Sequence, residues 1–590
     1  MRLIGPPLPP LRAQTFVEAL RLSASSPFHL TFIDAREAET RLDYGALYRH
    51  ARQLAHALAE RGVQPGDRVA LVLPTGPDFV EAFFAVQFAG AVPVPLYPPV
   101  RLGRMEEYVK ATARMLNVVG ARMVLSDARV KLLLGQAIAL ASVSLGCPTV
   151  SELRGGRGEL ERQAAPDSLG VIQFSSGSTV DPKAVALSHG ALTAQCAALE
   201  SLMRNPDITQ PVGVSWLPLY HDMGLIGCLL SGVYQAGPLA LLPPEAFLVK
   251  PALWLRAISK HRATISPAPN FAYGLCLKRV RPVDLDGVDL SRWAYALNGA
   301  EPVSADTLTR FGRRFAPQGF RREALMPVYG MSEASLAVTF TSPRGEKRAL
   351  SIDPVALASR GAVEPPDAHA NTPPRTLVSV GTPVPGAELE VRDAAGTALG
   401  ERQQGRIFVR GPFVMAGYFN DAEATARALP GGWLDTGDLG FLDGGELFIC
   451  GRAKDVVIVR GRNHAPQEFE DALEAVEGVR LGCAVAVGFV PPEGGDEQLL
   501  LLVETSGEAT ADLKVRVEAA VLARTGVRSH TVMLLEPGTL PRTSSGKLRR
   551  GEALRRHQSA GLTPPRKVNA LSMTREFARS ALGYAKAALE

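Results

Sequence analysis

Paired cysteines, clustered charge and long apolar runs are all lacking in this sequence. Its six cysteines are scattered without the spacing of a zinc site or a disulfide framework, so buried reduced thiols are expected. The net charge is only +5 over 590 residues, and no Lys/Arg block is interleaved with aromatic residues, which argues against a nucleic-acid partner. With 46% hydrophobic residues, the chain can still bury a large core and should divide into several domains.

Signals for export or for a membrane span are also missing. Residues 1–14 contain four prolines where a signal peptide would need an apolar helix. The nearly uncharged segment 225–249 is interrupted by three prolines and Glu245, so it predicts a buried helix, a turn and a strand. We therefore expect a cytoplasmic protein with no transmembrane segment.

Helices and short apolar strands alternate in the first part of the chain. Helices are predicted over residues 44–61 and 105–119, and buried strands over 69–73 and 121–125. Strands that are buried on both faces and separated by helices are typical of parallel sheets. The sequence therefore predicts an α/β fold with doubly wound parallel sheets, and the same alternation resumes near Val171.

The pattern changes in the second part of the chain. Strands separated by Gly/Asp turns predict a β-rich subdomain before residue 450, and a compact α+β pattern follows Gly451. We expect a large N-terminal domain, a hinge, a small α+β lid domain and an amphipathic tail. Their predicted ranges are 1–450, 451–455, 456–560 and 561–590.

Residues 174–190, FSSGSTVDPKAVALSHG, crowd small hydroxyl residues around a glycine and place a lysine after them. Small side chains let the backbone wrap phosphate oxygens, and a nearby lysine supplies positive charge. The run lacks the second glycine of the Gly-x-x-x-x-Gly-Lys-Ser/Thr phosphate loop, and alone it is equally typical of a Ser/Gly turn. Motifs further along the chain decide between the two interpretations.

Five sequence motifs follow, and their residue patterns indicate a function more specifically than the loop alone does. They are SWLPLYHDMGLIG at 215–227, NGAEPV at 298–303, VYGMSEA at 328–334, WLDTGDLG at 433–440 and LPRTSSGKLRR at 540–550. Together with GRAKDVVIVRGRN at 451–463, their order resembles the adenylate-forming ligase superfamily over nearly the whole chain. Three further stretches make the chain similar to the fatty acyl-AMP ligases, namely LYPPVR at 96–101, PNFAYGLC at 269–276 and IVRGRNHAPQEFE at 458–470.

The resemblance implies an enzyme that uses ATP and Mg²⁺ to convert a fatty acid into an acyl-adenylate with release of pyrophosphate. The acyl group would then pass to the phosphopantetheine thiol of an acyl carrier protein, or of a carrier domain in a polyketide or peptide synthase. Such an enzyme is a fatty acid:acyl-carrier-protein ligase. The alternatives are a long-chain fatty acyl-CoA synthetase and a catalytically decayed regulator that binds nucleotide or acyl groups.

The resemblance also implies three catalytic residues, Lys547, His221 and Glu333. A lysine between the fatty carboxylate and the α-phosphate would offset the repulsion of two anions, although Lys547 alone is also typical of a solvated basic tail. His221 would position substrate, because a carboxylate needs no general base near pH 7. Glu333 and Thr179 would hold Mg²⁺, and Lys454 would be the hinge residue.

Nucleotide and acyl binding are assigned in the same way. The resemblance implies that His221, Phe271 and Tyr273 contact the acyl chain, although aromatic residues at helical spacing are more often core. Asp438 would accept hydrogen bonds from the ribose, and Tyr329 would stack on the adenine. The full set assigned to ATP and AMP is Ser175, Ser176, Gly177, Ser178, Thr179, Lys183, Asn298, Gly299, Ala300, Glu301, Tyr329, Gly330, Met331, Ser332, Asp438 and Arg452.

Three stretches leave alternatives open. The long polar segment between Ser342 and Pro374 is either a tolerated surface insertion or, by resemblance, an insertion that disfavours coenzyme A. Val180 and Ala184 stand where the family commonly has glycine, and Val180 keeps the decayed regulator open. The amphipathic tail at 561–590 would pack on the parent domain, dock a carrier protein or make weak peripheral membrane contact.

Overall fold

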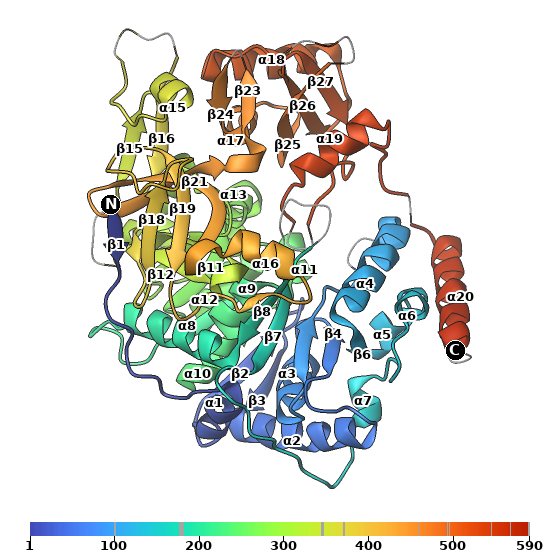
Figure 1. Ribbon diagram of the computed structural model, residues 1–590. Helices are drawn as coiled ribbons and strands as arrows, with labels where there is room; N and C mark the ends of the chain where they lie inside the picture. Colours follow the sequence, from blue (N-terminus) through green and yellow to red (C-terminus); the bar gives the residue numbers. More distant parts are fainter. Residues whose placement is uncertain are drawn as a thin grey trace.

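The computed structural model describes residues 1–99, 102–175, 182–343, 347–367, 369, 372–459, 461–491, 494, 496–543, 546–566 and 568–587. Helices and strands alternate in it, and helices cover several β-sheets, so the predicted α/β class is confirmed (Figure 1). We call residues 1–450 the large body and residues 456–560 the C-terminal unit. In Figure 1 the C-terminal unit lies at the top of the molecule, above the large body.

The main sheet of the large body has nine strands in the order β17-β14-β13-β12-β11-β9-β10-β2-β3. The six strands from β13 to β2 in this order are parallel to one another, as the helix and strand alternation predicts. The nine strands are β2 (His29–Ile33), β3 (Glu39–Asp43), β9 (Gly213–Ser215), β10 (Leu239–Leu241), β11 (Ile265–Pro269), β12 (Tyr295–Gly299), β13 (Leu325–Gly330), β14 (Ala337–Phe340) and β17 (Thr382–Pro383).

A second, smaller parallel sheet lies in the N-terminal part of the large body. It consists of β5 (Val92–Pro95), β4 (Arg68–Val72) and β6 (Ala121–Ser126). The helix predicted over residues 105–119 is α4 (Met105–Val119), and it ends at Gly120, whose φ of 57° is the left-handed conformation that favours glycine. The other helices of the large body are α1 (Phe16–Ser23), α2 (Tyr44–Glu60), α3 (Pro77–Phe88), α5 (Ala128–Lys131), α6 (Gly135–Ala141), α7 (Val150–Leu153), α8 (His189–Leu202), α9 (Asp222–Gly224), α10 (Ser231–Gln235), α11 (Pro244–Val249), α12 (Ala252–Lys260), α13 (Asn270–Arg279), α14 (Ala305–Phe315), α15 (Pro354–Arg360) and α16 (Ala422–Ala428).

The strand predicted near Val171 does not continue the parallel pattern. It is β7 (Leu169–Phe174), and it pairs antiparallel with β8 (Ala184–Ser188), which pairs in turn with β20 (Gly417–Tyr418). The expectation of parallel pairing here was wrong because residues 175–183 are too few for the crossover that parallel strands need. The predicted phosphate loop starts in this hairpin, but residues 176–181 lie outside the described residues.

The β-rich part of the large body is an antiparallel sheet that includes the N-terminus. Its order is β1 (Arg2–Ile4), β18 (Glu388–Arg392), β19 (Gly405–Arg410), β21 (Leu434–Asp443) and β22 (Glu446–Arg452). Strand β15 (Ala349–Ile352) lies in the long polar segment and pairs antiparallel with β16 (Arg375–Val378), which directly follows the segment. Strand β22 leads directly toward the C-terminal unit, so this sheet carries the connection between the two parts.

The C-terminal unit folds around a three-stranded sheet with an apolar cluster on each face. Helix α17 (Pro466–Asp471) and helix α18 (Ala511–Thr525) pack on one face, and α19 (Arg550–Gln558) packs on the other. The sheet consists of β25 (Val479–Phe489), β26 (Gln498–Thr505) and β27 (Thr531–Leu535), and β23 (Val457–Val459) and β24 (Arg462–His464) form a separate two-stranded sheet. The unit thus has its own core, separate from the clusters of the large body.

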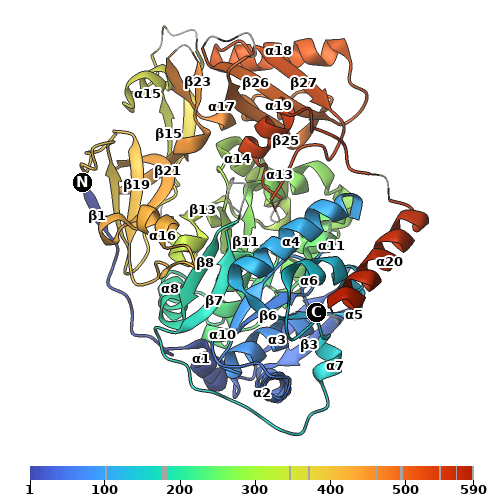
Figure 2. The same ribbon diagram turned by 45° about the vertical axis from the view of Figure 1, so that its right-hand side comes forward.

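The tail forms helix α20 (Ala570–Ala587), which returns to the large body and packs on α6 (Figure 2). Contact is made through small residues, because a Cβ on Gly135 would lie 1.9 Å from the carbonyl oxygen of Ser580. The apolar residues Leu571 and Leu582 point elsewhere and are 62% and 71% exposed. Among the described residues, no helix is long and apolar enough to cross a membrane.

Candidate active site

A cavity of about 1000 Å³ lies between the large body and the C-terminal unit. Its walls contain Lys183 from the loop at 174–190 and residues from each of the six later motifs, including Tyr329 and Asp438 from the large body and Lys547 from the C-terminal unit. A mixed apolar and charged cavity of this size is typical of a small-molecule site at a domain boundary.

The carboxyl ends of parallel strands form one wall of the cavity. Trp216 follows β9, Ala300 and Glu301 follow β12, and Tyr329 and Gly330 end β13. This edge is where ligands bind in open α/β sheets, because loops that leave the strands there surround a crevice. Gly330 has to be glycine, since a Cβ would lie 1.8 Å from the carbonyl oxygen of Leu336.

Tyr329, Asp438 and Arg452 form one polar group of the wall. The Tyr329 hydroxyl donates to Asp438 Oδ2 at 2.6 Å, and Arg452 Nε lies 3.2 Å from Asp438 Oδ1. Asp438 and Arg452 are opposite each other in the antiparallel pair of β21 and β22. Burial raises the pKa of Asp438, whereas Arg452 and the Tyr329 hydroxyl act in the opposite direction. The group presents carboxylate oxygens next to an aromatic ring.

A second polar group surrounds His221. Its Nδ1 lies 2.5 Å from Asp222 Oδ1, and the Ser332 hydroxyl donates to Asp222 Oδ2 at 2.6 Å. The backbone N–H of Met223 also donates to Asp222, at 2.7 Å. Burial alone would raise the pKa of Asp222, but His221 and Ser332 outweigh it and hold this pKa well below the usual range. Asp222 thereby fixes the orientation of the imidazole ring.

Lys547 reaches this cavity from a tight hairpin of the C-terminal unit. The Thr543 N–H donates to the Lys547 carbonyl at 2.8 Å, and the Lys547 N–H donates to Thr543 Oγ1 at 3.0 Å. Gly546 has a φ of 89°, which a side chain would disfavour. Burial lowers the pKa of Lys547, and the carboxylates of Asp222, Glu301 and Asp438 oppose that shift. The lysine thus lies within electrostatic reach of both polar groups.

Glu333 and Lys183 meet at Tyr418. The Tyr418 hydroxyl donates to Glu333 Oε1 at 3.0 Å, and Lys183 Nζ lies 4.3 Å from the centre of the Tyr418 ring. The Ser175 N–H donates to the Lys183 carbonyl at 2.9 Å and closes the hairpin. The predicted binding residues Ser176, Gly177, Ser178 and Thr179 lie outside the described residues, as does Val180.

The described part of the chain contains no group of three or more His, Cys, Asp and Glu residues that could hold a metal by itself. Glu333 nevertheless lines the cavity close to Lys183. Mg²⁺ is usually bound by one or two carboxylates together with substrate phosphates and water, so a single carboxylate in the cavity wall fits this ion.

Three predicted residues lie behind the cavity wall. Asn298 and Gly299 are fully buried in β12, and the Asn298 side chain donates to Asn270 Oδ1 at 3.1 Å. Tyr273 lies in an aromatic core with Trp254 and Phe311, and its hydroxyl donates to the Leu297 carbonyl at 2.9 Å. Because its hydroxyl and ring faces are already engaged, Tyr273 supports the wall, whereas Phe271 lines the cavity.

An apolar arm of the cavity was only partly predicted. Phe271 lies in it as expected, but Met203, Trp216, Ile265 and Leu336 were missed. A second cavity of about 60 Å³ shares Met203 and Ile265 with this arm. Trp216 was the one missed residue with a signal in the sequence, since it belongs to the motif at 215–227.

Replacing Asp222 with asparagine should destabilise the protein in a pH-dependent way. The folded-state pKa of Asp222 is lowered, so its contribution is present above the unfolded pKa and is lost as the pH falls. The substitution should lower the free energy of unfolding by about 1–3 kcal/mol near neutral pH. The difference in unfolding free energy between the wild type and Asp222→Asn should shrink below about pH 5.

Urea unfolding of the wild type and Asp222→Asn across this pH range measures the difference. Asp512→Asn is a matched control, because Asp512 is exposed on α18 and pairs with Arg516. A difference that stays the same down to low pH would contradict the assigned interaction.

Comparison with known proteins agrees with this geometry. Residues 23–419 match the family model described as AMP-binding enzyme. A Caulobacter vibrioides relative named "Putative acyl-CoA synthetase" is 38% identical over 91% of this chain and 94% of its own length. The medium-chain-fatty-acid–[acyl-carrier-protein] ligase JamA of Moorena producens is 34% identical, over 88% and 90%.

A solved structure from a study of fatty acyl-adenylate ligases from E. coli and L. pneumophila superposes with a TM-score of 0.86. It is 34% identical and covers 93% of this chain and 99% of that chain. The similarity to adenylate-forming ligases and to fatty acyl-AMP ligases, expected from the motifs, is thereby confirmed. The chain belongs to the AMP-binding enzyme family.

Proposed function

We propose that this protein activates a fatty acid with ATP and then transfers the acyl group to the phosphopantetheine thiol of a carrier protein. The observation that carries the proposal is the position of Lys547. It lies in a cavity that joins an apolar arm to a wall of polar groups, as a substrate with a fatty chain and a nucleotide requires. The proposal also draws on the name of the Moorena producens relative.

In the first step a carboxylate oxygen of the fatty acid attacks the α-phosphorus of ATP. The bond from that phosphorus to the bridging oxygen breaks, and pyrophosphate leaves. Both reactants are anions, so Lys547 lowers the barrier by offsetting the charge that accumulates between them. His221, oriented by Asp222, positions the carboxylate at the junction of the apolar arm and the polar wall.

The nucleotide occupies the polar wall. Asp438 accepts hydrogen bonds from the ribose hydroxyls while Arg452 holds its carboxylate, and Tyr329 offers its ring to the adenine. Lys183 and Glu333 lie toward the phosphates, where Glu333 would hold Mg²⁺. When bound, Mg²⁺ neutralises phosphate charge. In the second step the thiol sulfur attacks the acyl carbon, and AMP leaves with the electrons of the acyl–phosphate bond.

The polar segment after Ser342 bears on the choice of acceptor. This segment folds as β15, α15 and β16 beside the C-terminal unit. At its end Arg375 Nη1 lies 2.7 Å from Glu468 Oε1 on α17, and Arg375 Nη2 donates to the Cys450 carbonyl at 2.9 Å. The segment therefore helps to set where the C-terminal unit lies, which supports a role in acceptor choice.

A decayed regulator is the alternative of a different class. Val180, which keeps this alternative open, lies outside the described residues. The family also commonly has glycine at position 184. Ala184 is the first residue of β8, pairs with Phe174 and is 3% exposed, so its backbone needs no glycine. With Lys547, Asp438 and Glu333 all at one cavity, the catalytic proposal is the stronger one.

Lys547→Ala should lower the rate of acyl-adenylate formation by about 100-fold or more, because it removes a charge that acts in the transition state. Binding of ATP should change much less, since the nucleotide groups on the large body remain. Pre-steady-state formation of acyl-adenylate and equilibrium ATP binding measure the two effects. Lys514→Ala, on the exposed face of α18, is the control. An unaltered rate would remove Lys547 from the mechanism.

Acceptor choice is tested by direct competition. The purified protein receives Mg-ATP, fatty acids of graded length, and equal amounts of coenzyme A and phosphopantetheinylated carrier protein. Mass spectrometry then identifies the acylated thiol. We expect acyl-carrier protein with little acyl-CoA. Predominant acyl-CoA would make the protein a fatty acyl-CoA synthetase, and the segment after Ser342 would then be a surface insertion.

A further inference from the structure

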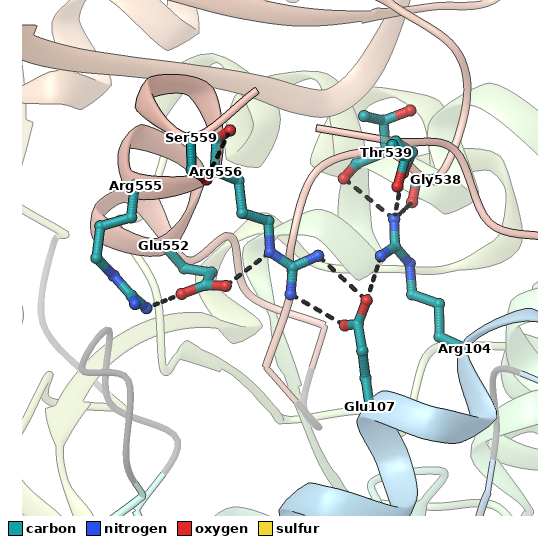
Figure 3. A network of polar contacts seen from close by, with 9 residues as sticks. Arg104, Glu107, Gly538, Thr539, Glu552, Arg555, Arg556 and Ser559 are labelled. Atoms are coloured by element: carbon teal, nitrogen blue, oxygen red, sulfur yellow. Dashed lines mark hydrogen bonds and ion pairs between the residues drawn. The ribbon is translucent and has the colours of Figure 1, made fainter. Parts of the chain in front are cut away.

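The contact surface between α4 of the large body and the C-terminal unit contains a polar network that the proposed mechanism does not use. Arg104 ends a short 3₁₀ turn (Leu102–Arg104), and Glu107 lies in the first turn of α4. Figure 3 shows both side chains pointing toward the C-terminal unit and joined to it by hydrogen bonds and ion pairs. Their side chains are 12% and 50% exposed.

Arg104 holds the backbone just before the lysine hairpin. Its Nη2 donates to the carbonyls of Gly538 at 3.1 Å and Thr539 at 3.3 Å. The next residue, Leu540, is fully buried in the C-terminal unit, and its N–H donates to Glu504 Oε1 at 2.9 Å. A shift of residues 538–539 would therefore move the base of the hairpin that carries Lys547.

Glu107 holds the helix just after the same hairpin. Its carboxylate receives Arg556 Nη2 at 3.0 Å and Nη1 at 3.3 Å, and Arg104 Nη1 at 2.6 Å. Arg556 lies on α19, which begins at Arg550, and its Nε also donates to Glu552 at 2.6 Å. Arg104 and Glu107 of the large body therefore bind the chain on both sides of residues 540–549.

The same turn also holds the linker to the tail helix. Arg104 Nη2 donates to the Thr563 carbonyl at 2.8 Å, and the Arg566 N–H donates to the Gly103 carbonyl at 3.2 Å. A Cβ on Gly103 would lie 2.6 Å from the Arg566 carbonyl oxygen, so the two backbones are in close contact. Helix α20 packs on α6. The linker before it is therefore attached to the large body at residues 103–104 and, through α20, at α6.

From this arrangement we infer that Arg104 and Glu107 are positioning residues, which place the Lys547 hairpin over the cavity for the first half-reaction. Neither side chain is among the residues that line the cavity, so both act through Lys547. Charged hydrogen bonds to three carbonyls and a bidentate ion pair are strong and directional, and they fix geometry as well as adding stability. The inference rests on the role proposed for Lys547.

Arg104→Ala and Arg556→Ala should each lower the rate of acyl-adenylate formation by about 10- to 100-fold, because a small misplacement of a catalytic group costs this much. The KM values for ATP and fatty acid should change little. Arg104→Lys, which keeps the charge but not the fork of donors, should restore part of the rate. Lys110→Ala on α4 and Arg516→Ala on α18 are matched controls, because Lys110 pairs with Glu106 and Arg516 with Asp512, outside the network.

The second readout needs no activity. Reductive methylation followed by mass spectrometry measures how fast Lys547 is modified relative to the exposed Lys514. The Lys547 side chain is partly buried and lies near carboxylates in the wild type, so release of its hairpin in Arg104→Ala should speed its modification by about tenfold. Lys110→Ala and Arg516→Ala should leave this ratio at the wild-type value.

Slower adenylation together with faster modification of Lys547 supports the inference. Slower adenylation with unchanged modification would overturn it, because Arg104 would then act by another route. Wild-type rates in both Arg104→Ala and Arg556→Ala would overturn it as well. If the wild type formed no acyl-adenylate, the proposed function would fail, whereas the modification ratio would still test whether Arg104 positions Lys547.

Discussion

The balance of charge around Lys547 is the constraint on which the rest of this structure depends. A buried ammonium group loses the solvation of water, and its pKa falls unless carboxylates compensate. Asp222, Glu301 and Asp438 supply that compensation from three separate segments of the large body. The fold therefore has to bring strands far apart in the sequence to one edge of a sheet, and it has to hold a second unit against that edge.

Each part of the architecture contributes to this balance. Parallel strands β9, β12 and β13 place Trp216, Glu301 and Tyr329 at the carboxyl edge of the main sheet. The antiparallel pair of β21 and β22 adds Asp438 and Arg452 from the side. The C-terminal unit, with an apolar core of its own, then carries Lys547 into the space that these residues enclose. Contacts from Arg375 and Arg104 keep that unit in place from two sides.

The sequence predicts the fold class and much of the cavity, because both depend on local patterns. Helix α4 starts and ends where its apolar periodicity predicts, and the motif residues Tyr329, Asp438 and Lys547 reach a single cavity. Other features depend on contacts between distant segments. Whether β7 pairs parallel or antiparallel is decided by the short connection to β8, which periodicity does not report.

The side chains that the sequence did not indicate have the same explanation. Tyr273 belongs to a family-like motif, yet its ring packs against Trp254 and Phe311 from other elements. The backbones of the tail helix and α6 come close at Ser580 and Gly583, and Met573 and Tyr584 pack on an apolar cluster of the large body. In the sequence nothing distinguishes Arg104 from other arginines, because its partners, the carbonyls of residues 538–539, lie far along the chain.

Fatty-acid-dependent exchange of labelled pyrophosphate into ATP, measured without any thiol acceptor, tests the central claim most directly. The account predicts exchange that requires both Mg²⁺ and a fatty acid, because adenylation is reversible and is complete before a thiol is needed. Exchange that is absent with fatty acids of every length would contradict the account, and it would leave the cavity as a binding site without this chemistry.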